Sequence, residues 1–282
     1  MKTIKVLIGL IITHFLLFSC TSEKVKIKND LSELHLIGKV KTLTETMFDA
    51  TDKFGEIQKG DLHYKDVMLF DEKGNRIEAN IYNSDDSLKR KFIYKYDDKD
   101  NKIEWNLYNT DGSLYQKYTY KYDDKGNKIE DNSNSTDSSL NEKCIYNYDD
   151  NGNEIEWNLY NSNGSLDKKI TYKYDDKGNK IEENWYKPDG SLDNKYTYKY
   201  DNKGNKNEEN EYNLGGSLYS KHTYKYDDKD NKIEENSYNS KGNLYNTDTF
   251  KYDYDKSGNW IKETEFKNGI PKYIIEREIK YY

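Results

Sequence analysis

Hydrophobic and polar positions alternate along most of the chain, and the alternation recurs at a fixed interval. In the stretch 192–201, Tyr196, Tyr198 and Tyr200 alternate with Thr197 and Lys199. An alternation with period two, rich in residues that favour strands, predicts a β-strand with one aromatic face. A shorter strand-like run follows at 206–212, and a turn rich in Asn and Gly follows each of the two runs.

The interval between equivalent positions is 26 residues, which makes the internal repeat the strongest signal in the chain. Short turns between consecutive strands force neighbouring strands to run antiparallel. We therefore predict an all-β fold, in which tandem 26-residue repeats of two antiparallel strands form an extended, twisted or coiling β-meander sheet. The columns that define the repeat are Tyr96, Tyr122, Tyr148, Tyr174, Tyr200, Tyr226 and Tyr252, then Leu88, Leu114, Leu140, Leu166, Leu192, Leu218 and Leu244.

The strand register within a repeat stays open at this stage. An even-length loop at 124–127 would set Tyr122 opposite Ile129, whereas the second turn more naturally sets Tyr108 opposite Leu114. Trp105 and Tyr108 differ in parity, so both faces of the short strand carry an aromatic residue unless a bulge intervenes. A glycine at a fixed turn position, replaced by Asp100 and Asp230 in two copies, predicts a positive φ at that position.

The ends of the chain differ from the repeats. We predict a signal peptide at 1–19, a tether at 20–30, an N-terminal β cap at 31–69, the repeats at 70–259 and a C-terminal capping hairpin at 260–282 with its turn at Asn268-Gly269. The last strand is predicted to be the exposed edge of the sheet, where its charged residues would resist pairing with another chain.

The repeated motif is similar to a known one. Tyr-Asp-x-x-Gly, followed by a polar residue and Ile, reads here Tyr122-Asp123-Asp124-Lys125-Gly126-Asn127 and recurs from about Phe70 to Asn259. It resembles the YD repeats of the Rhs family. The resemblance implies sheets that wind into β-spirals, sometimes as a shell around a toxin. Asn stands where that family usually has Arg, so the resemblance supports the fold class more than a function.

The first twenty residues indicate export. Lys2 and Lys5 precede an apolar run from Val6 to Phe18, which is typical of a secretory signal. The run ends in Leu17-Phe18-Ser19-Cys20, which resembles the lipobox of bacterial lipoproteins. That resemblance implies cleavage before Cys20, lipid on its thiol and, since Thr21 is not acidic, an outer-membrane or cell-surface location. The alternative is a plain signal peptide with a chance cysteine.

Charge argues against nucleic acid as a partner. The chain carries a net charge of −7, and removal of 1–19 with its two lysines would make it −9. A nucleic-acid binder presents a basic surface to the phosphates. Charges of both signs alternate along the repeats, as expected of a solvated surface.

Catalytic chemistry is not evident in the sequence. The histidines have no partners at metal-ligand spacing, the Asp-Gly-Asn turns lack the spacing and final Glu of an EF-hand, and Glu182 and Glu183 point to opposite faces of a strand. We expect no enzyme activity, no cofactor, no metal and a monomer.

The aromatic residues are the remaining candidates for a site. They could pack the sheet, or they could form a ladder on which sugars stack, as in the aromatic-rich repeats of cell-wall-binding proteins. Our first hypothesis is a membrane-tethered, non-enzymatic scaffold or spacer that binds another macromolecule. The second is a carbohydrate- or cell-wall-binding module. A further alternative is a fragment of a toxin-associated YD-repeat shell. The candidate stacking residues are Trp105, Tyr108, Trp157, Tyr160, Trp185, Tyr186, Tyr212 and Tyr238.

Overall fold

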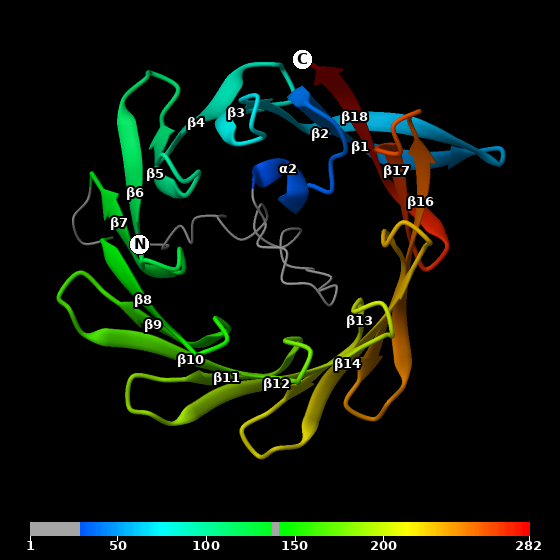
Figure 1. The fold of residues 1–282 in the computed structure, drawn as a ribbon. Coiled ribbons are helices and arrows are strands. Elements are labelled where there is room, and N and C mark those ends of the chain that lie inside the picture. Colours follow the sequence, from blue (N-terminus) through cyan, green and yellow to red (C-terminus); the bar gives the residue numbers. More distant parts are fainter. Residues whose placement is uncertain (1–28, 137–140) are drawn as a thin grey trace, which may run out of the picture.

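The computed structural model describes residues 29–136 and 141–282, and these residues form a closed β-barrel with one short helix (Figure 1). Each strand pairs antiparallel with the next one along the chain, and β1 also pairs with β18. The predicted all-β meander of two-stranded repeats is confirmed, and its coiling is complete. The strands of the N-terminal region and the first repeats are β1 (Val40–Lys53), β2 (Glu56–Phe70), β3 (Arg76–Tyr82), β4 (Leu88–Tyr96), β5 (Lys102–Tyr108), β6 (Leu114–Tyr122), β7 (Lys128–Ser135) and β8 (Glu142–Tyr148).

The remaining strands continue the same long–short alternation around the ring. The helix, labelled α2, spans Asp30–Glu33. Among the described residues, no helix is long and apolar enough to cross a membrane. The later strands are β9 (Glu154–Tyr160), β10 (Leu166–Tyr174), β11 (Lys180–Tyr186), β12 (Leu192–Tyr200), β13 (Lys206–Tyr212), β14 (Leu218–Tyr226), β15 (Lys232–Asn239), β16 (Leu244–Tyr254), β17 (Trp260–Lys267) and β18 (Ile270–Tyr281).

The prediction that the last strand is an exposed edge is wrong. β18 pairs with β17 on one side and with β1 on the other, where Thr46 lies opposite Glu276 and Leu43 opposite Ile279. Regions 31–69 and 260–282 therefore contribute strands to the wall of the barrel. Closure removes both sheet edges, whose unpaired N–H and C=O groups would otherwise face solvent or another chain.

The Asp-x-x-Gly-Asn turns are held by their own side chains. Asp97 accepts hydrogen bonds from the backbone N–H groups of Lys99 and Asn101, and Asn101 Nδ2 donates to Asp97 Oδ2 at 2.9 Å. Position 100 has a φ of 63°, and the equivalent Gly126 has a φ of 78°. The predicted positive φ is confirmed, which explains why Gly or Asp occupies this position.

The tyrosine that precedes each of these turns has a structural role. Each short strand begins with a β-bulge, in which Tyr122 pairs with Lys128 and Lys121 with Glu130. Tyr122, at the end of β6, donates from its hydroxyl to the bulge carbonyl of Lys102, at the start of the preceding strand β5, at 2.6 Å. A bulge disrupts the ladder locally, and the tyrosine gives this backbone carbonyl a hydrogen-bond donor. The same contact recurs from Tyr96, Tyr148, Tyr174, Tyr200, Tyr226 and Tyr252.

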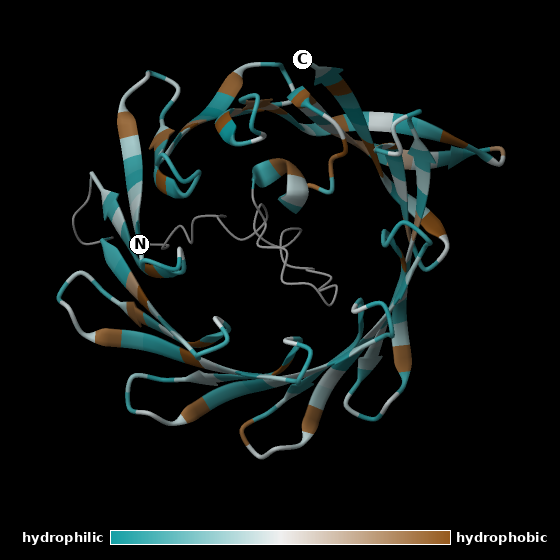
Figure 2. Cartoon of the chain, in the orientation of Figure 1, coloured by the Kyte–Doolittle hydropathy of each residue, from teal (hydrophilic) through white to brown (hydrophobic). Residues whose placement is uncertain are grey.

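The bulge also decides which side chains of the short strand face the outside of the barrel. In the second turn the expected pairing of Tyr108 with Leu114 is confirmed. Glu104 points outward, where Lys95 and Lys117 bridge it at 2.8 and 2.6 Å and Asn106 donates to it. This outward arrangement of a glutamate with lysines and an asparagine recurs around the barrel. The outer wall is consequently polar, and Figure 2 shows apolar positions only as separate bands among hydrophilic ones.

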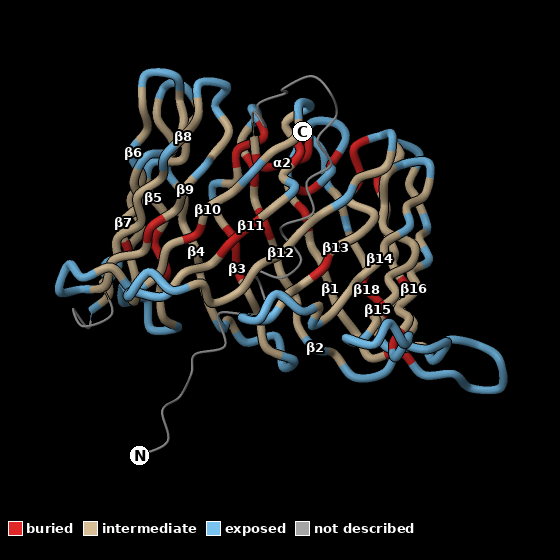
Figure 3. Tube along the Cα trace, turned by 90° about the horizontal axis from the view of Figure 1, so that it is seen from below, coloured by how far each residue is buried: buried red, intermediate tan, exposed pale blue. Residues whose placement is uncertain are grey.

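Three of the four most deeply buried apolar residues lie where α2 contacts the wall. Phe70, Val40 and Leu43 are almost completely buried and pack with Leu31 and Leu34 of the helical segment. Elsewhere most residues of the wall are only half-buried (Figure 3). The barrel therefore has one local core beside α2 and depends on strand pairing around the rest of the ring.

Candidate ligand-binding site at the mouth of the barrel that carries α2

Helix α2 lies inside the ring of strands, at one mouth of the barrel (Figure 1). Asn29 caps it by accepting a hydrogen bond from the backbone N–H of Ser32, and Asn29 Nδ2 donates to the carbonyl of Lys73 at 2.8 Å. Leu31 N–H donates to the carbonyl of Gly74 at 3.2 Å. The β2–β3 turn thus fixes the start of the helix.

Asp30 is the principal polar contact between α2 and the wall. Its carboxylate is 4% exposed and accepts from Tyr96 Oη at 2.6 Å, Lys102 Nζ at 2.7 Å and the backbone N–H of Arg76 at 2.9 Å. Burial alone would raise the pKa of Asp30, but Lys102, Arg76 and Tyr96 together outweigh it and lower that pKa. The carboxylate is therefore ionised at neutral pH and fully paired.

The wall explains why α2 docks at this place. In other repeats the inward-facing lysine at the bulge pairs with a carboxylate three residues later, as Lys180 does with Glu183 at 2.5 Å. The equivalent position after Lys102 is Trp105, which cannot pair with the lysine. Asp30 of α2 supplies the missing carboxylate to Lys102, so the helix completes the charge pattern of the wall where this repeat lacks it. The intact pairs are Lys128–Asp131, Lys180–Glu183, Lys206–Glu209 and Lys232–Glu235.

The inward lysines also bind the tyrosines beside them. Lys180 Nζ lies 5.0 Å from the ring centroid of Tyr172 and 5.1 Å from that of Tyr198. Lys206 lies 5.2 Å from the rings of both Tyr198 and Tyr224. Each lysine therefore joins the tyrosines of two successive repeats by cation–π contacts, and the lumen carries a belt of alternating ammonium and aromatic groups.

A cavity of about 320 Å³ opens between α2 and the wall. The helix contributes carboxylates, the Asp-x-x-Gly-Asn turns contribute carboxylates and amides, and the wall contributes tyrosines and lysines. This combination offers flat aromatic faces together with charged and neutral hydrogen-bonding groups. The lining residues include Asp30, Glu33, Asn75, Tyr96, Asp100, Asn101, Lys102, Tyr120, Tyr122 and Lys128.

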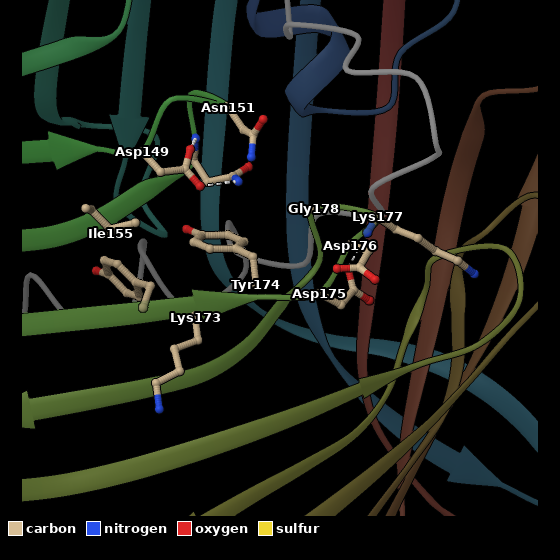
Figure 4. Close-up of a pocket in the computed structure, with 11 residues that line it drawn as sticks. Asp149, Asn151, Ile155, Lys173, Tyr174, Asp175, Asp176, Lys177 and Gly178 are labelled. Atoms are coloured by element: carbon tan, nitrogen blue, oxygen red, sulfur yellow. Dashed lines mark hydrogen bonds between the residues drawn. The ribbon is translucent and has the colours of Figure 1, made fainter.

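A second cavity of about 600 Å³ lies on the same mouth, between two successive turns. Figure 4 shows Asp149 and Asn151 on one turn, Lys177 on the next, and Tyr174 between them, while Ile155 lies on the other side of Asp149. The two cavities share the same residue types because both are built from the repeat.

Glu154 interrupts the lysine belt beside this second cavity. It occupies the position of Lys128 and Lys180 in the adjacent repeats, at the start of β9. Burial raises the pKa of Glu154 to about 7, although both lysines act to lower it. Near neutral pH, this inward carboxyl group is therefore only partly ionised.

The substitution Glu154→Gln should stabilise the barrel at high pH. The folded-state pKa of about 7 lies above the ordinary value of 4.5. The native state therefore binds the proton more tightly, and stability falls as pH rises from 4.5 to 7. Glu154→Gln should remove this fall, which amounts to up to about 3 kcal/mol, so the variant should gain on the wild type at pH 8 but not at pH 4. Urea unfolding at both pH values measures the difference.

Glu156→Gln is the matched control. Burial opposes the ionisation of Glu156, but Lys169, Asn158 and Asn147 lower its pKa. The pKa of Glu156 therefore shifts in the direction opposite to that of Glu154. The ionised carboxylate of Glu156 therefore stabilises the folded state above pH 4.5, and Glu156→Gln should destabilise the protein at pH 8. Equal effects of the two substitutions at pH 8 would refute the assignment of Glu154 to the lumen.

The candidate stacking residues fall on two faces. Trp105, Trp157 and Trp185 face the lumen, and the ring of Trp105 stacks on Tyr118 with centroids 4.0 Å apart. The tyrosines face outward with the Glu–Lys clusters, and Tyr212 Oη lies 3.4 Å from Thr197 Oγ1 on that side. The eight residues therefore do not form one ladder, because the strand alternation separates Trp105 from Tyr108. The outward set is Tyr108, Tyr160, Tyr186, Tyr212 and Tyr238.

Other expectations from the sequence have different outcomes. Cys20 lies outside the described residues. Within residues 29–136 and 141–282, no cluster of His, Cys, Asp or Glu could hold a metal ion. Asp30 was not among the predicted site residues, because the predicted tether extends to residue 30. A local signal was present, since Asn29-Asp30-Leu31-Ser32-Glu33 has the capping residue and early carboxylates of a helix start.

Neither a protein-family model nor a curated protein sequence matches the chain. Solved structures resemble it in chain path only distantly. One is a porin-like protein from Bacteroides uniformis ATCC 8492, with a TM-score of 0.45 and 10% identity over 86% of this chain and 96% of the other. A DUF1329 family protein from Desulfovibrio piger ATCC 29098 has a TM-score of 0.28 and 8% identity over 86% of each chain.

A third structure is the complex TcdB2-TccC3-Cdc42. The match has a TM-score of 0.34 and 12% identity over 81% of this chain. This chain spans about 15% of the length of the chain it matches there.

Proposed function

We propose that the protein is a non-enzymatic binding barrel of the bacterial envelope, and that the mouth around α2 binds carbohydrate. The observation that carries the proposal is the cavity between α2 and the wall, where tyrosines, carboxylates, amides and lysines converge. Sugar rings bind through an apolar face that stacks on aromatic residues and through hydroxyl groups that bond to carboxylates and amides. The residues of this mouth provide both kinds of contact within one cavity.

The dimensions of the site favour a chain of sugars over a small compact ligand. Barrels of 16 to 18 strands leave an open lumen, unlike barrels of about eight strands, which side chains fill. The cavity of about 320 Å³ lies at the lower end of the usual range for ligand pockets, and the cavity of about 600 Å³ lies within it. Both lie on the same mouth, so an oligosaccharide could contact more than one copy of the repeat.

The envelope location rests on the first twenty residues. The signal-like run and the lipobox-like Leu17-Phe18-Ser19-Cys20 support export and lipid attachment at Cys20. The outer wall, with its Glu–Lys–Asn clusters, differs from the apolar band of a barrel that faces lipid. We therefore propose a barrel that is tethered to a membrane and does not span it.

A scaffold that binds another macromolecule is the second candidate. The observation in its favour is the outer row of tyrosines, one in most repeats, beside the Glu–Lys clusters. Tyrosine is common among the residues that anchor protein interfaces.

Glycan-array binding followed by calorimetry tests the carbohydrate proposal. The chain from residue 20, with Cys20→Ala, should bind at least one class of oligosaccharide. Glu33→Ala removes a carboxylate that lines the cavity and should lower the affinity by about tenfold, as the loss of a charged hydrogen bond does. Glu72→Ala removes an exposed carboxylate from the adjacent β2–β3 turn and should have no effect.

Two results would count against this function. The first is the absence of binding to every glycan on the array. The second is a bound glycan whose affinity is the same for Glu33→Ala, Glu72→Ala and the unsubstituted chain.

A further inference from the structure

The rim opposite α2 is built from the other set of turns. Because successive strands run in opposite directions, the hairpin turns that follow odd-numbered strands all lie on one rim. The turns that follow even-numbered strands lie on the rim that carries α2, where Leu31 contacts Gly74. Figure 3 shows α2 at one end of the barrel and the long β1–β2 hairpin projecting at the other.

Four adjacent hairpins on this opposite rim carry large apolar side chains in solvent. They are the hairpins β13–β14, β15–β16, β17–β18 and β1–β2, which are neighbours because β18 pairs with β1. Phe54, at the tip of the projecting β1–β2 hairpin, is fully exposed, and Ile270 at the next tip is 69% exposed. We name these four tips the apolar arc; its other exposed members are Ile57, Leu214, Tyr219, Leu244 and Tyr245.

The apolar arc is also basic, although the protein as a whole is acidic. Its four tips, at 52–59, 213–219, 239–245 and 267–272, contain five lysines and two carboxylates, and one of the lysines, Lys59, pairs with Glu276. On the same rim, the tips at 83–87, 109–113, 161–165 and 187–191 contain four aspartates and one lysine. The rim is therefore divided into an apolar, basic half and a polar, acidic half.

We propose that the apolar arc docks on an anionic lipid surface. Side chains such as Phe54 and Tyr245 can enter the boundary between headgroups and acyl chains, while Lys241, Lys267 and Lys272 meet anionic headgroups. Lipid accommodates separate projecting tips, whereas a folded protein partner would have to match each of them. A second copy docked in the same way would bring like-charged lysines together, which disfavours self-association.

Vesicle sedimentation tests the proposal. The chain from residue 20, with Cys20→Ala, keeps α2 and every strand but has no thiol to acylate at that position. It should bind vesicles that contain phosphatidylglycerol more tightly than vesicles of phosphatidylcholine, and added salt should weaken the binding. The triple substitution Phe54→Ser, Leu244→Ser and Tyr245→Ser should lower vesicle affinity by at least about tenfold.

Leu114→Ser is the control, because Leu114 is 41% exposed on the same rim but outside the arc. It should leave vesicle binding unchanged. All of these side chains are exposed, so circular dichroism and the melting temperature should match those of the unsubstituted chain.

Three results would overturn the proposal. They are the absence of vesicle binding, equal vesicle binding by the triple variant and the unsubstituted chain, and a dimer in solution that the triple variant dissociates. The last result would assign the arc to a second copy of the chain. Glycan binding at the α2 mouth involves the other rim and should be the same in all of these variants.

Discussion

The substitution Asp30→Ala should destabilise the barrel by about 3 to 5 kcal/mol and release α2 from the lumen. Asp30 is almost completely buried and pairs with Lys102 while it accepts bonds from Tyr96 and from the backbone of Arg76. Removal of one member of a buried ion pair leaves the other charged and unpaired, which produces losses of this size. Urea unfolding measures the loss of stability, and tryptic cleavage after the exposed Lys39 should become faster as α2 detaches.

A second substitution, Lys102→Met, distinguishes the cost of an unpaired buried charge from the cost of losing the helix contacts. In Asp30→Ala with Lys102→Met, the unpaired ammonium is gone, and part of the lost stability should return. Asp85→Ala removes an exposed turn carboxylate on the opposite rim and should leave stability and tryptic cleavage close to those of the wild type. Wild-type stability and tryptic cleavage in Asp30→Ala would mean that the apolar contacts of Leu31 and Leu34 alone hold the helix.

The elements of the repeat could be predicted from the sequence because they depend on local chemistry. Alternation in the long strands and the Asp-x-x-Gly-Asn turns determine where a strand begins and ends. The positive φ at Asp100 and Asp230 follows from the residues that replace glycine. The opposite orientations of Glu182 and Glu183 follow from strand geometry, and their ion pairs with Lys195 and Lys180 agree with this.

The candidate site was harder to predict because it depends on parity and on distant contacts. One bulge at the start of each short strand places Lys102 inward and Glu104 outward, although residues two positions apart on a regular strand share a face. Parity alone left open whether a bulge would bring Trp105 and Tyr108 to one face, and the observed register places them on opposite faces. The contact of Asp30 with Lys102 spans 72 positions, and no local pattern records it.

The closure of the sheet could not be derived from the period. A 26-residue repeat specifies one hairpin and its pairing to the next, but the curvature that accumulates over 18 strands decides whether the ends meet. The predicted open sheet and the observed barrel share every ladder except β1–β18. This one ladder therefore distinguishes the two arrangements.

A disulfide across that ladder should form and should stabilise the protein by about 5 kcal/mol. Thr46 of β1 lies directly opposite Glu276 of β18, so Thr46→Cys with Glu276→Cys places two thiols on paired strands. The bond closes a loop that contains nearly all of the barrel, and long loops give the largest loss of entropy in the unfolded chain. Cys20→Ala and Cys144→Ala should be included so that no other thiol reacts. Unfolding in urea with and without reductant gives the difference.

The same experiment decides between a closed barrel and an open sheet. In an open sheet, β1 and β18 would lie at opposite ends, and the two cysteines would form bonds only between molecules. The control pair is Thr46→Cys with Glu234→Cys. It places the cysteines on β1 and β15, which do not pair with each other, so no intramolecular disulfide should form. Glu276 bridges Lys59 on a partly exposed surface, so its loss should cost at most about 1 kcal/mol and cannot hide the gain. If mass spectrometry finds only the reduced chain or crosslinked dimers, the ring is open, and each repeat depends on its neighbours alone.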